Sequence, residues 1–165
     1  MIVVSDTSPL TNLAAIGQLE LLRHLYAQLH IAEAVWDELN AGGQRWPGRD
    51  QIAQADWVHR HTTHERSLIT ALQRDLDRGE AESLALAIEL GADLILLDER
   101  EGRRAAQRLG LQVVGVVGIL LHAKAVGVLH HVRPSLDALR HIAGFYLSEG
   151  VYQQALRLAN EHDSL

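Results

Sequence analysis

Short apolar runs alternate with amphipathic stretches along the first 126 residues of the chain. A compact apolar run of strand length suits a strand buried on both faces, whereas apolar residues at a spacing of three or four suit a helix. This alternation predicts strands at residues 2–6, 30–32, 57–61, 94–97 and 112–114. It predicts helices after residue 6 as far as Gly17, at 18–28, 33–40, 65–76, between Gly79 and Gly91, at 100–109 and at 117–126.

The order of these elements favours a parallel sheet with helices on both sides, because short linkers join each strand to the next helix. Residues 41–56 interrupt the pattern and read as a surface loop with one helical turn. We expect residues 1–127 to form this α/β domain. Residues 128–165 carry two further helices, at 134–142 and 149–160, and are expected to be a helical extension packed on the same domain.

Length and composition narrow the class of protein. A chain of 165 residues without cysteine is expected to be one domain with no disulfide framework and no thiolate metal site. We see neither a signal peptide nor a membrane span, so a cytoplasmic protein is expected. The net charge of −6 argues against attraction of nucleic acid over the whole surface, although bound metal ions would neutralise several acids.

Four acids are placed by this pattern at one edge of the sheet. Asp6 and Asp98 each end an apolar strand, and ligands of parallel α/β sheets bind beyond the carboxyl ends of the strands. Glu38 shares a helix face with Val35 and Leu39, which turn inward. Glu80 lies in the first turn of the helix that precedes the strand ending at Asp98.

Glu80 and Glu82 are separated by helix geometry. Two positions on, a residue is rotated by about 200°, so both side chains cannot face the same point. We favour Glu80 as the inward acid. Glu82 is expected to point outward or to support the site from behind.

A cluster of carboxylates indicates a divalent cation, because like charges otherwise disfavour ionisation of their neighbours. Oxygen ligands select Mg²⁺ or Mn²⁺. A water made more acidic by such a metal is a nucleophile for phosphodiester hydrolysis. Taken singly, each acid is explained as well by a helix cap or by the helix dipole, so the prediction depends on the set.

The ordered set resembles the successive acidic motifs of PIN (PilT N-terminus) domains, the ribonucleases typified by VapC toxins. The matching segments are D-T-S-P-L at residues 6–10, V-W-D-E-L at 35–39, G-E-A-E at 79–82 and L-L-D at 96–98. The run G-V-V-G-I-L at 115–120 with Ala123-Lys124 resembles one uncharacterised prokaryotic subgroup. The resemblance covers roughly residues 1–125.

This resemblance implies a three-layer α/β/α fold and Mg²⁺- or Mn²⁺-dependent cleavage of single-stranded RNA. It also implies a homodimer and often a small antitoxin partner. The family's acids fall on Asp6, Glu38, Glu80 and Asp98, and its hydroxyl near the metal waters falls on Ser8, which could equally cap a helix. Glu80 stands where many family members have Asp. The alternative is a PIN-like RNA- or protein-binding module that has lost catalysis.

The sequence also contains a stripe of arginines and a cluster of histidines. Arg100, Arg104 and Arg108 share a helical stripe that could hold an RNA backbone, or be a solvated face paired with Glu101. His59, His61 and His64 form a second cluster, for which a polar edge is favoured over a metal site. The chain lacks the sequence signatures of related α/β classes. Residues 6–9, for example, read D-T-S-P where a dinucleotide-binding fold has a glycine-rich turn.

Overall fold

The computed structural model describes residues 1–41 and 46–162. Within them, a five-stranded sheet has the order β3-β2-β1-β4-β5, and all neighbouring strands are parallel. The strands are β1 (Val3–Ser5), β2 (Leu29–Ala32), β3 (Val58–His61), β4 (Leu94–Leu96) and β5 (Val113–Val114). This confirms the predicted parallel sheet, with β3 as the edge strand.

The helices of the described residues follow the predicted order closely. They are α1 (Thr7–Ala15), α2 (Glu20–Tyr26), α3 (Glu33–Leu39), α4 (Arg49–Gln54), α5 (Arg66–Leu72), α6 (Arg78–Leu90), α7 (Arg100–Arg108), α8 (Val116–Ala125), α9 (Arg133–His141) and α10 (Glu149–Leu158). Helix α4 lies in the segment expected to be a loop with one helical turn; part of that segment, residues 42–45, lies outside the described residues.

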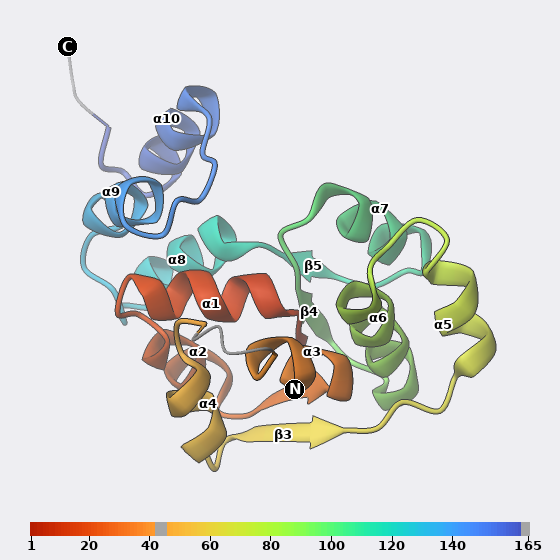
Figure 1. Cartoon of the computed structure of the whole chain (residues 1–165). Helices are drawn as coiled ribbons and strands as arrows, with labels where there is room; N and C mark the ends of the chain where they lie inside the picture. The colour runs from red at the N-terminus through yellow and green to blue at the C-terminus, as the bar shows by residue number, and fades with distance from the viewer. Residues whose placement is uncertain (42–45, 163–165) are drawn as a thin grey trace.

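Side chains alternate between the two faces of the sheet and create two cores. Val3 and Leu96 pack with α1, α2 and α8, whereas Val4 and Ile95 pack with α6 and α7. Figure 1 shows α1, α2 and α8 on one side of the strands and α5, α6 and α7 on the other. The three-layer α/β/α architecture is therefore confirmed.

The sheet order reverses at β1, and this reversal creates the crevice in which parallel α/β proteins bind ligands. The chain after β1 leads toward β2 on one side, and the neighbour on the other side is β4. The register pairs Val4 with Ile95, and the backbone N–H of Asp6 donates to Leu96 O at 3.0 Å. The loops that carry Asp6 and Asp98 therefore open side by side at one edge.

Helices α9 and α10 continue the first core beyond α8. Leu136, Leu139 and Leu156 are buried in the same apolar cluster as Ile119 and Leu120 of α8. In Figure 1 both helices lie beyond α8, on the side of the molecule away from α6. A division of the chain at residue 127 stays a prediction. No described helix is long and apolar enough to cross a membrane.

Candidate active site

Asp6 is buried at the end of β1 and begins helix α1. Its side chain is 4% exposed, and its backbone stands at the position before the first residue of the helix. The sequence allows Thr7 or Ser8 to cap this helix, but the residue at the cap position is Asp6, and no side chain of the described residues makes the capping hydrogen bond. The two hydroxyls are thereby released for other contacts.

Glu38 is held against the start of α1 from helix α3. Thr7 Oγ1 donates to Glu38 Oε2 at 2.5 Å. On the other side, a Cβ atom added to Gly79 would lie 2.2 Å from Glu38 Oε1. Only glycine therefore leaves room for this carboxylate beside the first turn of α6. Asp37, by contrast, is exposed and pairs with Arg78.

Glu80 lies inside the molecule at the start of helix α6. Its side chain is 8% exposed, and its Oε2 would be 2.7 Å from a Cβ atom added to Gly102 of α7. The helix begins at Arg78 and is capped by Asp77, whose Oδ1 accepts from the backbone N–H of Glu80 at 2.8 Å. Asp77 thereby fixes the residue that carries the third predicted acid.

Asp98 follows β4 by two residues and turns toward the start of α8. Its Oδ1 accepts from the backbone N–H of Val116 at 2.8 Å. A Cβ atom on Gly115 would lie 2.7 Å from the same oxygen and 2.6 Å from Arg103 Nη1. Gly115 therefore lets an arginine and the carboxylate approach the same stretch of backbone.

Burial makes these acids difficult to ionise. Burial, opposed by the Thr7 backbone N–H and assisted by Glu38, raises the pKa of Asp6 to about 7. Burial and the neighbouring Asp77 and Asp6 raise the pKa of Glu80 to about 8. Burial also raises the pKa of Glu38 and the pKa of Asp98. The site therefore concentrates carboxyl groups without enough internal positive charge to balance them.

Two carboxylate oxygens in this region have no hydrogen-bond partner within the described part of the chain: Glu80 Oε2 and Asp98 Oδ2. Buried polar atoms nearly always have a hydrogen-bond partner. Two buried carboxylate oxygens without one, in the same crevice, therefore point to a bound ligand as their partner. The donors are all carboxylate oxygens, which suit a hard divalent cation. No three described acidic or histidine side chains already stand as a closed ligand set. The bond to Val116 accounts for this in part, because it draws Asp98 toward α8.

Glu82 does not point outward as one expectation had it. It is 3% exposed; its Oε1 accepts from the backbone N–H of Ala34 at 3.3 Å and its Oε2 from Arg78 Nε at 2.7 Å. Helix α6 is buried from Gly79 to Ala87, so this part of it has no solvent face. Glu82 therefore anchors the start of α3, the helix that carries Glu38.

Of the remaining predicted residues, Ser8 lies beside Asp98, whereas the two arginines lie on the surface of α7. The Ser8 hydroxyl partly opposes the burial that raises the pKa of Asp98, and it also accepts from Asn12 Nδ2 at 3.0 Å. Arg100 and Arg104 are exposed on α7, and Arg104 pairs with Glu101 at 3.3 Å. The arginine that faces Asp98 is Arg103, which lines the same cavity. The pair of Arg104 with Glu101 is the one expected if the stripe is a solvated helix face.

Sequence reasoning gave no role to Asp77 or Arg103, and from the sequence Glu99 extends the acidic edge or caps the following helix equally well. Asp77 and Glu99 both raise the pKa values of Asp6 and Glu80, so they belong to the same electrostatic cluster. A signal for Asp77 was present, because Asp77-Arg78-Gly79-Glu80 has the spacing of a capping box. No comparable signal marks Arg103, whose role depends on how α7 is rotated against the sheet.

A histidine cluster lies apart from the acids on β2 and β3. His30 Nδ1 and His61 Nε2 are 2.8 Å apart, and the rings of His30 and His59 have centroids 5.3 Å apart. Burial and the neighbouring histidines lower the pKa values of His30 and His61. His64, which we had grouped with this cluster, is exposed beyond the strand, and its backbone N–H bonds Glu89.

The fold and the crevice define a parallel α/β domain with an acidic site at the reversal of its strand order. A family model described as a PIN domain matches residues 2–161, so the chain belongs to the PIN-domain family. The match extends past the 125 residues of the sequence resemblance and takes in α9 and α10. PIN domains are typically metal-dependent nucleases, which indicates nuclease-type activity for this chain. A search of curated proteins finds no match.

Proposed function

We propose that the protein is an endoribonuclease that uses Mg²⁺ or Mn²⁺ to hydrolyse phosphodiester bonds in single-stranded RNA. Asp6, Glu38, Glu80 and Asp98 hold the metal in this proposal. The observation that carries it is the pair of buried, unpartnered oxygens, Glu80 Oε2 and Asp98 Oδ2, in the crevice between β1 and β4. A divalent cation supplies the positive charge that the described residues do not provide there.

The residues around the four acids have positioning roles. Thr7 holds the Glu38 carboxylate through its hydroxyl, and Asp77 fixes the turn that carries Glu80. Gly79 and Gly102 keep space open around the carboxylates of Glu38 and Glu80. Because Asp6 and Glu80 have pKa values of about 7 and about 8, each gives up its proton when a cation binds.

A bound Mg²⁺ or Mn²⁺ would lower the pKa of a coordinated water and neutralise charge on the scissile phosphate. The chain's own contribution is to hold four carboxylates in a buried crevice and to exclude histidine and thiolate, which favour other metals. Ser8, beside Asp98, is available to orient a water or a phosphate oxygen.

The biological setting is part of the same proposal. The acidic motifs resemble those of VapC toxins, so we propose a cytoplasmic toxin with a small antitoxin partner and a homodimeric state. Exposed apolar side chains on α10, Val151 and Leu158, offer surface for such contacts. The quickest check is whether the neighbouring reading frame encodes a small protein that suppresses toxicity and co-purifies with this chain.

The direct experiment is cleavage of a labelled single-stranded RNA with Mg²⁺, with Mn²⁺ and with EDTA. Loss of a residue behind a metal ligand typically costs 10–100-fold, so Asp98→Asn should lower the rate by at least about 100-fold. The matched control is Glu20→Gln, which changes an exposed acid of α2. Activity that persists in EDTA or in Asp98→Asn contradicts the mechanism. Absence of cleavage under every condition favours the inactive binding module.

A further inference from the structure

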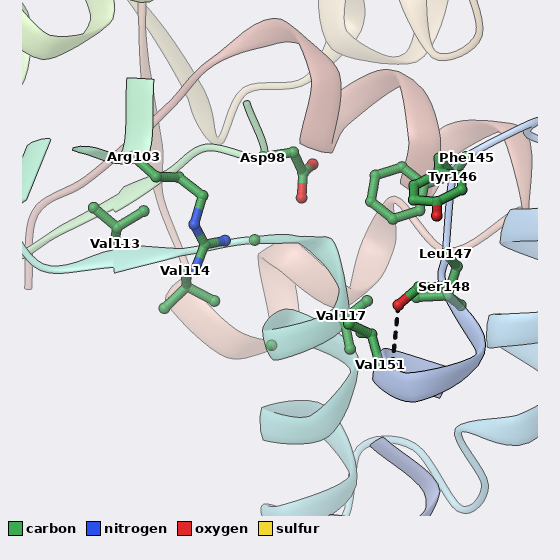
Figure 2. Close-up of a pocket in the computed structure, with 12 residues that line it drawn as sticks. Asp98, Arg103, Val113, Val114, Val117, Phe145, Tyr146, Leu147, Ser148 and Val151 are labelled. Carbon is green, nitrogen blue, oxygen red and sulfur yellow. Dashed lines mark hydrogen bonds between the residues drawn. The ribbon is translucent and has the colours of Figure 1, made fainter. Parts of the chain in front are cut away.

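A second cavity adjoins the acidic crevice on the side of α8. Its volume is about 490 Å³, which is within the range of small-molecule sites. Asp98 and Arg103 line one part of it, and the segment between α9 and α10 lines another. Figure 2 shows the Asp98 carboxylate between Arg103 on one side and the aromatic rings of Phe145 and Tyr146 on the other. The cavity thus joins the candidate active site to the C-terminal helices.

The walls of this cavity combine an apolar surface with a charged mouth. Val113, Val114 and Val117 form the apolar part nearest the sheet, and Val151 adds to it from α10. The side chain of Arg103 donates one long hydrogen bond among the described residues, from Nη1 to Leu97 O at 3.5 Å. Its guanidinium therefore keeps most of its donors for a ligand, beside an acid that we place in the metal site.

Tyr146 is the most distinctive part of the lining. It is 87% exposed, an unusual state for a large aromatic side chain. The backbone on both sides of it is nevertheless fixed. The Phe145 N–H donates to Leu139 O at 2.8 Å, and Leu147 O accepts from Arg140 Nη2 at 2.8 Å. The chain thus presents an aromatic ring to solvent from a rigid segment, at the edge of a cavity.

We propose that this cavity binds a nucleobase of the single-stranded substrate, with the Tyr146 ring as the stacking surface and Arg103 as the contact for the adjacent phosphate. The inference rests on the proposed function and deepens it, since it assigns a base-binding subsite next to Asp98. Aromatic rings stack on every base, and arginine forks bind phosphate oxygens in pairs. An apolar side chain of a protein partner would leave the free donors of the Arg103 guanidinium without an acceptor.

The test measures the affinity of a fluorescent, cleavage-resistant 2′-O-methyl phosphorothioate oligonucleotide for the intact protein in Mn²⁺. Tyr146→Ala should weaken binding by about 10-fold, within the range known for loss of one base–aromatic stack. Tyr146→Phe keeps the ring and should remain within about 2-fold of wild type. Ile142→Ala removes another exposed apolar side chain, 70% exposed just after α9 and outside the cavity lining, and should have no effect.

A set of oligonucleotides with one abasic position, moved along the strand, makes the test specific. At one position, removal of the base should weaken the binding of the oligonucleotide to the wild-type protein. The Tyr146→Ala variant should bind that abasic oligonucleotide with the same affinity as wild type. This coupling is expected from a direct stack and not from a change in folding. The inference is overturned if Tyr146→Ala binds every oligonucleotide like wild type, or if its loss is the same at every abasic position.

The two proposals fail in different ways. If the protein cleaves RNA with Mn²⁺ but shows no coupling between Tyr146 and a base, the subsite is wrong and the nuclease proposal stands. If coupling appears without any cleavage, the base subsite stands on a protein that binds RNA without cutting it. Tight binding of an apolar peptide that competes with no oligonucleotide would assign the cavity to a protein partner and overturn the inference.

Discussion

Two carboxylates in different parts of the molecule, the partly buried Glu161 and the buried Asp6, have pKa values shifted in opposite directions. Glu161, just after α10, accepts from Lys124 Nζ at 2.7 Å and from the backbone N–H of Val132 at 2.8 Å. Burial raises its pKa, but Lys124 and the backbone donors outweigh that effect, and the pKa is lowered. Asp6 is buried and its charged neighbours are acids. Its pKa is therefore raised, to about 7.

The difference separates a structural acid from one prepared for a ligand. Glu161 ties α8 to the start of α9, and every partner it needs is part of the chain. The burial and mutual repulsion of Asp6 and Glu80 cost free energy, and contacts among the described residues do not offset this cost. An external cation would offset that cost, which is why we assign function to the crevice and structure to the junction of α8, α9 and α10.

The largest effect that sharpens this comparison is expected from Gly79→Ala. The new Cβ would lie 2.2 Å from Glu38 Oε1, so the carboxylate must move away from its place in the crevice. We expect the rate of Mn²⁺-dependent cleavage to fall by about 10–100-fold. The stability should change little, because the displaced atom ends a flexible side chain and alanine favours the helix by about 1 kcal/mol. Kinetics and thermal denaturation of the same sample check both parts.

Gly150→Ala is the matched control for that substitution. It also places a Cβ atom on a helical glycine, in α10, and nothing lies within 4 Å of that atom. Its cleavage rate should equal that of wild type. If Gly79→Ala keeps full activity, then the position of Glu38 is irrelevant to catalysis, and Glu38 must be removed from the proposed ligand set.

The next effect concerns stability and should distinguish the two carboxylates directly. Glu161→Gln removes charge-assisted hydrogen bonds and leaves Lys124 without its anion, so the free energy of unfolding should fall by about 1–3 kcal/mol. Asp6→Asn in EDTA at pH 8 should raise the melting temperature, because it removes a buried charge whose neighbours are acids. Denaturation of both variants beside wild type checks the pair. Equal destabilisation by the two substitutions would remove the distinction between the regions.

Most of the fold could be predicted from the sequence because the ends of its helices and strands are clearly marked. Gly17 and Gly91 adopt positive φ, of 72° and 61°, at the ends of α1 and α6, where the sequence pattern had placed the breaks. The apolar runs at 94–97 and 112–114 became β4 and β5 with a change of one residue at one end. These signals are local, so they survive without knowledge of the tertiary structure.

The details of the site depended on contacts that no periodicity reveals. Helix geometry left Glu82 either pointing outward or supporting the site from behind. The outward direction is wrong, because α6 is buried at this turn and the backbone N–H of Ala34 in α3 donates to Glu82. His30 was overlooked beside His59 because only the pairing of β2 with β3 brings them together. Charge links Glu38 to Asp6 and Asp6 to Glu80, and Asp77 and Glu99, which the sequence did not mark as site residues, raise the same two pKa values. The ligand set of four acids stays a prediction.

The pH dependence of stability tests the central claim, because it detects the uncompensated carboxylates and their cation together. The pKa of Asp6 rises from 3.8 to about 7 on folding, so between these values the folded protein binds more protons than the unfolded chain. The contribution of Asp6 to the free energy of unfolding therefore falls as the pH rises. His30 and His61, whose pKa values are lowered, contribute a slope of opposite sign, but they are common to wild type and Asp6→Asn.

The decisive measurement is therefore the difference in melting temperature between Asp6→Asn and wild type, from pH 5 to pH 8, in EDTA and in millimolar Mn²⁺. In EDTA the account predicts that Asp6→Asn becomes the more stable protein as the pH rises. In Mn²⁺ at pH 8 it predicts the reverse order, because binding stabilises only the protein that has the site. A difference that changes with neither pH nor Mn²⁺ would contradict the account.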